Sequence, residues 1–345
     1  MKTKKLILLI SILAIPSVSF SQLDWNLGGN NVNGTSYLGT DGSSTAPLQL
    51  KTIETGGSAL PINFFTNNTL VGSFTIAGNF NLVNAPNAFL INDNPILHYR
   101  GAVGSTPSTT NIFVGVGAGY SNTTGTENTC VGSQAGFSNA IESDETFIGY
   151  QAGYSTHSGP GNTFVGAQAG YSNTTGVGNV FMGVRAGYDN FTVTYPDGSY
   201  NTIIGNLAGE HNTIGKYNCF YGKHAGWDNR TGDGNVYIGD HCGTNSISHY
   251  QNTCIGLVSG ENNTGNNNVM LGVNSGHDNT GHKNILCGQG AGKTNSGDTN
   301  ILIGTYTGFN NSGDFNIIFG QIAGWDNTGD TNVVIGVAAG NSNTG

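Results

Sequence analysis

The chain has 345 residues, of which 56 are glycine and only 9% are charged, and its formal net charge is −9 at pH 7. A helical protein of this length would be richer in Lys, Glu, Leu and Ala. A surface for nucleic acid would be basic rather than acidic. Because 36% of the residues are hydrophobic and 10% are aromatic, a disordered chain is also disfavoured.

Residues 1–21 read as a secretion signal. Three of the first five residues are lysine, the run Leu6–Ile15 is apolar, and small residues Ser19 and Ser21 precede an expected cleavage before Gln22. The apolar run is too short to span a bilayer. We therefore expect a secreted, extracellular protein, at the outer membrane or cell surface if it is retained, with no membrane span and no nucleic-acid partner.

The next segment, 22–100, shows no repeat and reads as short β pieces between Gly, Asn and Pro turns. We interpret it as a β-rich N-terminal leader region. The stretch 101–110 is rich in small residues and is expected to be a linker.

Tandem repeats of 16 or 17 residues fill 111–345. Each begins with Asn (position 0), and continues with three apolar or Thr residues (positions 1 to 3), Gly (4), a small residue (7), Gly (8), often an aromatic residue (9), and an Asn-Thr-Gly turn. Short strands between glycine and asparagine turns, repeated without helices, predict an all-β fold, a β-solenoid (β-roll) of about fourteen coils.

The position 4 glycines recur at steps of 17 residues four times, 22 once, 17 three times and 16 five times. The 22-residue step is an insertion around Tyr195-Pro196-Asp197-Gly198, and the shorter step removes one turn residue. Changes confined to turns imply that the strands keep their register.

Side chains alternate between the two faces of a strand, yet positions 1 to 3 are all apolar or Thr. We expect positions 1 and 3 to fill the coil and position 2 to face outward. An outward stripe of that length would need covering, most simply in a side-by-side homotrimer. The opposite assignment, with position 2 inside, would weaken this argument without changing the fold. The expected interface comprises Phe113, Phe147, Phe164, Phe181, Phe220, Tyr237, Leu286, Leu302 and Ile318.

The position 9 column is the best candidate for ligand binding, because aromatic side chains beside Asn could contact sugar rings. The alternative is a structural ladder that packs on itself. The candidate residues are Tyr120, Phe137, Tyr154, Tyr171, Tyr188, Trp227 and Trp325.

Other chemistry is weakly indicated. His224 and His241 share position 6 of adjacent coils, where they could form a surface metal site. Because the same column also holds Gln and Arg, we expect these histidines to be ordinary exposed polar residues. The segment Cys287–Thr294 nearly spells a phosphate-binding loop, but its glycines are ordinary repeat positions. The five cysteines occupy apolar or small positions and are expected to be small hydrophobes rather than disulfides. We predict no catalytic residues, metal or cofactor.

The phrase Asn162-Thr-Phe-Val-Gly-Ala-Gln-Ala-Gly-Tyr-Ser-Asn-Thr-Thr-Gly176 resembles the repeats of bacterial tail-fibre-like surface proteins. Those proteins often end in an endosialidase-type intramolecular chaperone domain that trimerises and cleaves itself off. The repeat is also similar to the head repeat of trimeric autotransporter adhesins, whose shorter unit runs Asn-x-x-x-Ile-Gly-x-x-Ala. The resemblance covers 111–345. No such chaperone domain follows Gly345, where the chain ends in phase with the repeat, so we expect a fragment.

The resemblance and the repeats together predict a secreted or surface-displayed structural and adhesive fibre that acts through multivalent weak binding, with itself and with glycans or surface proteins as partners. The alternative is a polysaccharide-binding or polysaccharide-degrading tail-spike-like protein, which would need a cleft with two carboxylates. An ice-binding solenoid would need flat threonine ladders, and position 1 carries Thr at 129, 146, 163 and 202 but Ile or Val in the last six coils.

Overall fold

The computed structural model describes residues 111–191 and 197–345 in full, and before them the backbone of five strands. The expected signal segment 1–21 and linker 101–110 lie outside the described residues. Three of the early strands form one sheet, β1 (Ile62–Thr66), β2 (Thr69–Phe74) and β3 (Phe80–Leu82). The other two, β4 (Ala88–Ile91) and β5 (Asn94–His98), pair antiparallel with each other, and β5 pairs antiparallel with the first strand of the repeats.

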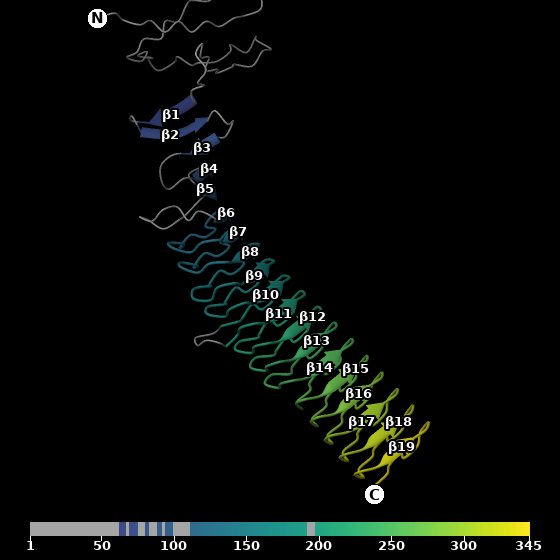
Figure 1. The fold of residues 1–345 in the computed structure, drawn as a ribbon. Coiled ribbons are helices and arrows are strands. Elements are labelled where there is room, and N and C mark those ends of the chain that lie inside the picture. The colour runs from purple at the N-terminus through teal and green to yellow at the C-terminus, as the bar shows by residue number, and fades with distance from the viewer. Residues whose placement is uncertain are drawn as a thin grey trace, which may run out of the picture. The chain divides into compact units, whose positions relative to one another are not determined.

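The repeats form a parallel β-solenoid, which confirms the predicted fold (Figure 1). Each repeat contributes one three-residue strand, and the fourteen strands define about thirteen complete coils. The strands are β6 (Ile112–Val114), β7 (Thr129–Val131), β8 (Thr146–Ile148), β9 (Thr163–Val165), β10 (Val180–Met182), β11 (Thr202–Ile204), β12 (Cys219–Tyr221), β13 (Val236–Ile238), β14 (Thr253–Ile255), β15 (Val269–Leu271), β16 (Ile285–Cys287), β17 (Ile301–Ile303), β18 (Ile317–Phe319) and β19 (Val333–Ile335).

Each strand pairs in parallel with the next, and residues at the same repeat position lie opposite each other. The register holds across the 22-residue step, where Phe181 of β10 faces Ile203 of β11. It also holds where the period shortens to 16, since Cys254 of β14 faces Met270 of β15. The variation in repeat length is therefore absorbed outside the strands, as the sequence predicts.

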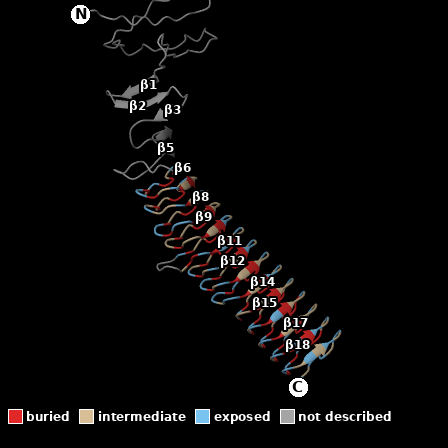
Figure 2. Ribbon diagram, viewed as in Figure 1, coloured by how far each residue is buried: buried red, intermediate tan, exposed pale blue. Residues whose placement is uncertain are grey.

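The interior of the solenoid holds the position 2 side chains, which is the opposite of the expected orientation. Buried residues recur along the whole solenoid (Figure 2). The predicted interface residues are all buried within the chain itself, with exposures of 1% or less: Phe113, Phe147, Phe164, Phe181, Phe220, Tyr237, Leu286, Leu302 and Ile318. They cannot form an interface between copies, and that prediction was wrong. The residues at positions 1 and 3 face outward instead.

Space inside the coil explains this orientation. A three-residue strand that turns one side chain inward turns the two flanking side chains outward. Gly170 lies against the Phe164 ring, and a Cβ added there would come within 2.5 Å of that ring, while the neighbouring buried residue Ala169 is also small. Each coil therefore has room for one large side chain, not two.

Polar residues complete the interior as two ladders of asparagine. At position 0, the Oδ1 atom of Asn252 accepts the backbone N–H of Asn268 at 2.9 Å, and the Nδ2 atom of Asn268 donates to the Gly281 carbonyl at 2.9 Å. In the turn, the Nδ2 atom of Asn279 donates to Oδ1 of Asn263 at 2.8 Å. These bonds satisfy buried amides along the stack, which would otherwise be costly.

The glycine at position 4 is required by both conformation and space. Gly272 has φ 131°, and a Cβ there would lie 2.7 Å from the carbonyl oxygen of Gly288 in the next coil. Any larger residue would separate the coils, which is why this glycine marks the repeat so reliably. Among the residues that the structure describes, no helix has the length and apolar character needed to cross a membrane.

Candidate functional site

The outward side of the strands carries two parallel columns, formed by positions 1 and 3 of β6–β19, which we call the strand face. All 28 residues of these columns are apolar, Thr or Cys, and none is charged. They are only partly covered: Ile148, Met182, Tyr221 and Ile255 are among the exposed large hydrophobic residues. The strand face is thus an uncharged stripe that runs along every coil of the solenoid.

The position 9 aromatic residues stack on one another, as the structural alternative for this column predicts. Ring centroids lie 4.9 Å apart for Tyr120 and Phe137, and 5.1, 5.0 and 5.1 Å apart for the following pairs through Tyr154, Tyr171 and Tyr188. The rings are within 8° of parallel. Neighbours therefore cover both faces of the middle rings, and a sugar could reach only their edges.

The aromatic ladder changes character after Tyr188. Arg185 lies over the Tyr188 ring at 4.4 Å and forms an ion pair with Glu210 at 2.7 Å. The other carboxylate oxygen of Glu210 accepts the indole N–H of Trp227 at 2.7 Å. Trp325 stacks with Phe309 at 4.2 Å near the other end of the chain. The seven candidate ligand-binding residues thus form separate groups rather than one continuous surface.

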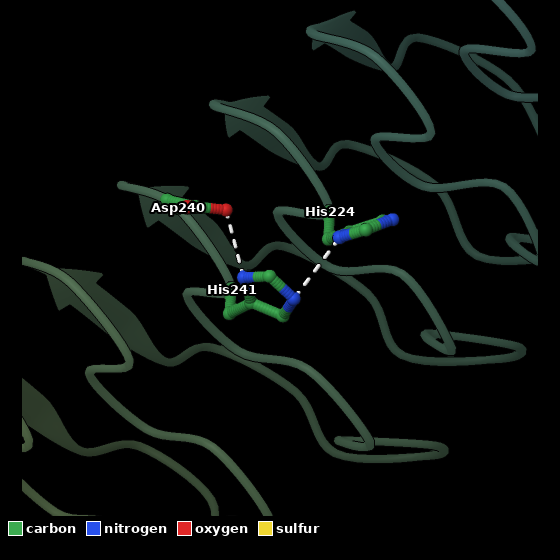
Figure 3. Close-up of side chains that lie close together, drawn as sticks. All are labelled: His224, Asp240 and His241. Carbon is green, nitrogen blue, oxygen red and sulfur yellow. Dashed lines mark hydrogen bonds and ion pairs between the residues drawn. The ribbon is translucent and has the colours of Figure 1, made fainter.

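A histidine pair lies on two adjacent coils (Figure 3). The ring of His224 packs edge-on against Trp227, with ring centroids 6.2 Å apart. His224 and His241 occupy position 6 of adjacent coils, and Nδ1 of His224 lies 3.0 Å from Nε2 of His241. On its other side, Nδ1 of His241 lies 2.7 Å from a carboxylate oxygen of Asp240. With Asp240 ionised, His241 donates Nδ1–H to it and accepts Nδ1–H from His224.

A pocket of about 200 Å³ adjoins this pair and is lined by His224, Trp227, His241, Thr244 and Asn245. The pocket exists because Thr244 takes position 9, where the preceding coil has Trp227. Burial lowers the pKa of His224, and the nearby His241 and Lys223 lower it further. The neutral imidazole, which carries a free lone pair for a ligand, is therefore favoured at physiological pH.

The segment Cys287–Thr294 behaves as an ordinary repeat. Cys287 ends β16, and the residues that follow form turns of the same coil rather than the start of a helix. All five cysteines are free thiols: Cys130, Cys242 and Cys254 are buried, whereas Cys219 and Cys287 are half-buried on the strand face.

Comparison of the chain with protein-family models, with curated proteins and with solved structures gave no match. Sequence reasoning aligned His224 with His241 but missed the pocket beside them. The signal was present, because Thr244 interrupts the aromatic column directly after Trp227. The sequence also did not predict the strand face, because positions 1 to 3 are all apolar or Thr and do not indicate which side chain points into the coil.

Proposed function

We propose that this chain is a non-catalytic structural and adhesive rod, secreted or surface-displayed, whose copies associate side by side through the strand face. The observation that carries the proposal is the absence of charge from all 28 positions of that face, whereas the neighbouring position 5 column includes Lys223 and Asp240. A stripe that excludes charge over fourteen strands is what a covered surface requires.

The size of the strand face supports an interface. Fourteen strands at about 4.8 Å are about 65 Å long, and three residues span about 10 Å, which gives about 650 Å² per chain. The largest apolar patch on a typical monomer is about 300–600 Å², and a stable complex buries about 800 Å² per partner. The face is thus close in size to a standard interface.

A second copy of the same chain is the occupant that fits best. The partner must present a long, uncharged surface, and a copy has the same coil spacing, so each coil can meet an equivalent coil. Rotational symmetry about an axis parallel to the solenoid preserves this match. We favour a homotrimer, which leaves the aromatic ladder and the polar columns on the outside. There they would bind glycans or surface proteins by avidity.

The test replaces apolar residues of the strand face with lysine. Ile255 and Ile285 lie on this face two repeats apart, in β14 and β16, and are 40% and 41% exposed. Leu257 and Val273 at position 5 are 48% and 40% exposed. We expect the Ile255→Lys/Ile285→Lys variant to lose association and the Leu257→Lys/Val273→Lys variant to keep it, because only the first pair would bury charge.

Sedimentation equilibrium of the chain from Gln22 measures the outcome, with circular dichroism to show that each variant is folded. An oligomer, expected near three times the monomer mass, that becomes monomeric only in the strand-face variant supports the proposal. A folded wild-type monomer, or equal behaviour of the two variants, contradicts it.

A second candidate function is adsorption to ice, and the outward orientation of position 1 favours it. Thr129, Thr146 and Thr163 lie in register on successive strands of the strand face. Such a column offers hydroxyl and methyl groups at about 4.8 Å intervals on a regular surface. Thermal hysteresis in a monomeric preparation would support this candidate, whereas its absence would remove it.

A further inference from the structure

We propose that His224 and His241 form a binding site for a divalent transition-metal ion of the Zn²⁺ or Cu²⁺ class, with Asp240 orienting His241 and the adjoining pocket admitting the remaining ligands. This site is independent of how the rods associate, since position 6 lies outside the strand face. Imidazole nitrogen is a preferred ligand for both metals.

The separation of the two nitrogen atoms fits two ligands of one ion. At a metal–nitrogen distance of 2.0–2.1 Å, two ligands would lie about 2.9 Å apart at a right angle and about 3.3 Å apart in a tetrahedron. Nδ1 of His224 and Nε2 of His241 are 3.0 Å apart. When the His224 proton moves from Nδ1 to Nε2 and the His224 ring turns, both nitrogen atoms can direct a lone pair to one metal ion, which replaces the shared hydrogen bond.

Asp240 gives this pair a feature of metal centres that a simple polar column lacks. Its carboxylate lies 2.7 Å from Nδ1 of His241, which leaves Nε2 as the coordinating nitrogen and fixes the plane of the ring. In metal sites, a ligating histidine commonly donates its second N–H to a carboxylate in this way. Among the described residues, His224, Asp240 and His241 form a group whose ligand atoms all lie within 4.8 Å of one another.

The pocket supplies the space for the other coordination positions. Its volume of about 200 Å³ is small for an organic cofactor but ample for an ion with several waters. Thr244 and Asn245 place polar groups on its wall, and the Trp227 ring bounds it. Two protein ligands and an open side describe an exchangeable site, in which waters or groups of a partner complete the coordination.

The repeat itself provides non-disruptive variants for the test. Position 6 is Gln134, Gln151 and Gln168 in three other coils, with φ values of 58°, 53° and 57°, close to the 54° of His224 and 56° of His241. His224→Gln and His241→Gln should therefore fold normally. The matched control is His211, which also pairs with a carboxylate, that of Asp189 at 2.7 Å, but whose ring packs against Trp227 instead of another histidine.

The first experiment titrates Zn²⁺ into the chain from Gln22, prepared without a histidine tag, and measures the binding affinity by calorimetry. The second experiment uses electron paramagnetic resonance of bound Cu²⁺ to count the nitrogen ligands. We expect two nitrogen ligands in the wild type and at least tenfold weaker Zn²⁺ binding in His224→Gln and in His241→Gln. Asp240→Asn should weaken binding about tenfold through loss of orientation. His211→Gln should bind as the wild type does.

Zn²⁺ should also raise the thermal midpoint of the wild type and not that of the double variant, because a ligand stabilises the state that binds it. If the wild type binds Zn²⁺ no more tightly than the His224→Gln/His241→Gln variant does, the proposal is overturned. A Cu²⁺ signal with a single nitrogen ligand would likewise contradict the paired site.

Discussion

Glu145 occupies position 0, where each of the other thirteen repeats has asparagine. Its side chain is fully buried, and one carboxylate oxygen accepts the backbone N–H of Asn162 at 3.0 Å, as an asparagine oxygen would. Burial raises the pKa of Glu145 to about 9, although the hydrogen bonds from Asn162 act in the opposite direction. The carboxyl group is therefore held neutral inside the solenoid at physiological pH.

This environment predicts a pH-dependent cost. The pKa of Glu145 is higher in the folded chain than its ordinary value of 4.5, so the folded state binds the extra proton and stability falls as the pH rises from 4.5 to about 9. The cost at pH 7 is on the order of 3 kcal/mol. Glu145→Asn, which restores the common residue, should raise the thermal midpoint relative to the wild type more at pH 7 than at pH 4.

Thermal unfolding of the two proteins at both pH values measures this effect. If Glu145→Asn only replaced one hydrogen-bonding side chain by another, the thermal midpoint would change by a similar amount at pH 4 and at pH 7. If it removes a group with a raised pKa, the increase in the midpoint is larger at pH 7. An equal shift at pH 4 and pH 7 would show that Glu145 does not titrate as described.

Each coil is held to the next by its strand and by the asparagine ladder at position 0, so a coil is not stable alone. Asn268 is fully buried and is bonded to both neighbouring repeats. Its backbone N–H donates to Oδ1 of Asn252 at 2.9 Å, and its Oδ1 atom accepts the backbone N–H of Asn284 at 2.8 Å. Its Nδ2 atom donates to the Gly281 carbonyl of its own repeat. Removal of this amide leaves the buried N–H of Asn284 without its partner, whereas the Gly281 carbonyl keeps the hydrogen bond that Asn279 donates at 2.7 Å.

We therefore expect Asn268→Ala to destabilise the chain by about 1–3 kcal/mol, the cost of unsatisfied buried groups. Thr280→Ala is a suitable control, because Thr280 is exposed in a turn of the same coil. Comparison of the thermal midpoints decides the matter: equal midpoints for the two variants would mean that the ladder contributes little to cohesion between coils.

The strands and their register follow from the sequence, because glycine at position 4 recurs wherever two coils approach too closely for a Cβ, as at Gly272 and Gly288. The in-or-out orientation did not follow, because Thr163, Phe164 and Val165 lack the alternation that would reveal a buried face. The orientation is determined by the small residues Ala169 and Gly170, which leave room for one large side chain inside the coil. These residues approach Phe164 only when the chain has folded into a closed coil.

For the whole solenoid, the orientation of the strands determines the proposed assembly. With position 2 inside, the uncharged columns at positions 1 and 3 face outward. An apolar surface still favours association between copies, but it is formed by positions 1 and 3 instead of position 2. The histidine site could be anticipated only in part, since the alignment of His224 with His241 is visible in the repeat but the 3.0 Å contact depends on ring orientation.

The most direct test of this account is thiol labelling of the folded chain with a maleimide, followed by mass spectrometry, in the wild type and in the Ile255→Lys/Ile285→Lys variant. Cys130 and Cys254 lie at position 2, where burial raises the pKa of both thiols, while Cys219 and Cys287 lie on the strand face. We expect Cys219 and Cys287 to be labelled in the variant and protected by association in the wild type, with Cys130 and Cys254 unlabelled in both. Labelling of Cys130 and Cys254 in folded protein, with Cys219 and Cys287 protected in both, would contradict the account.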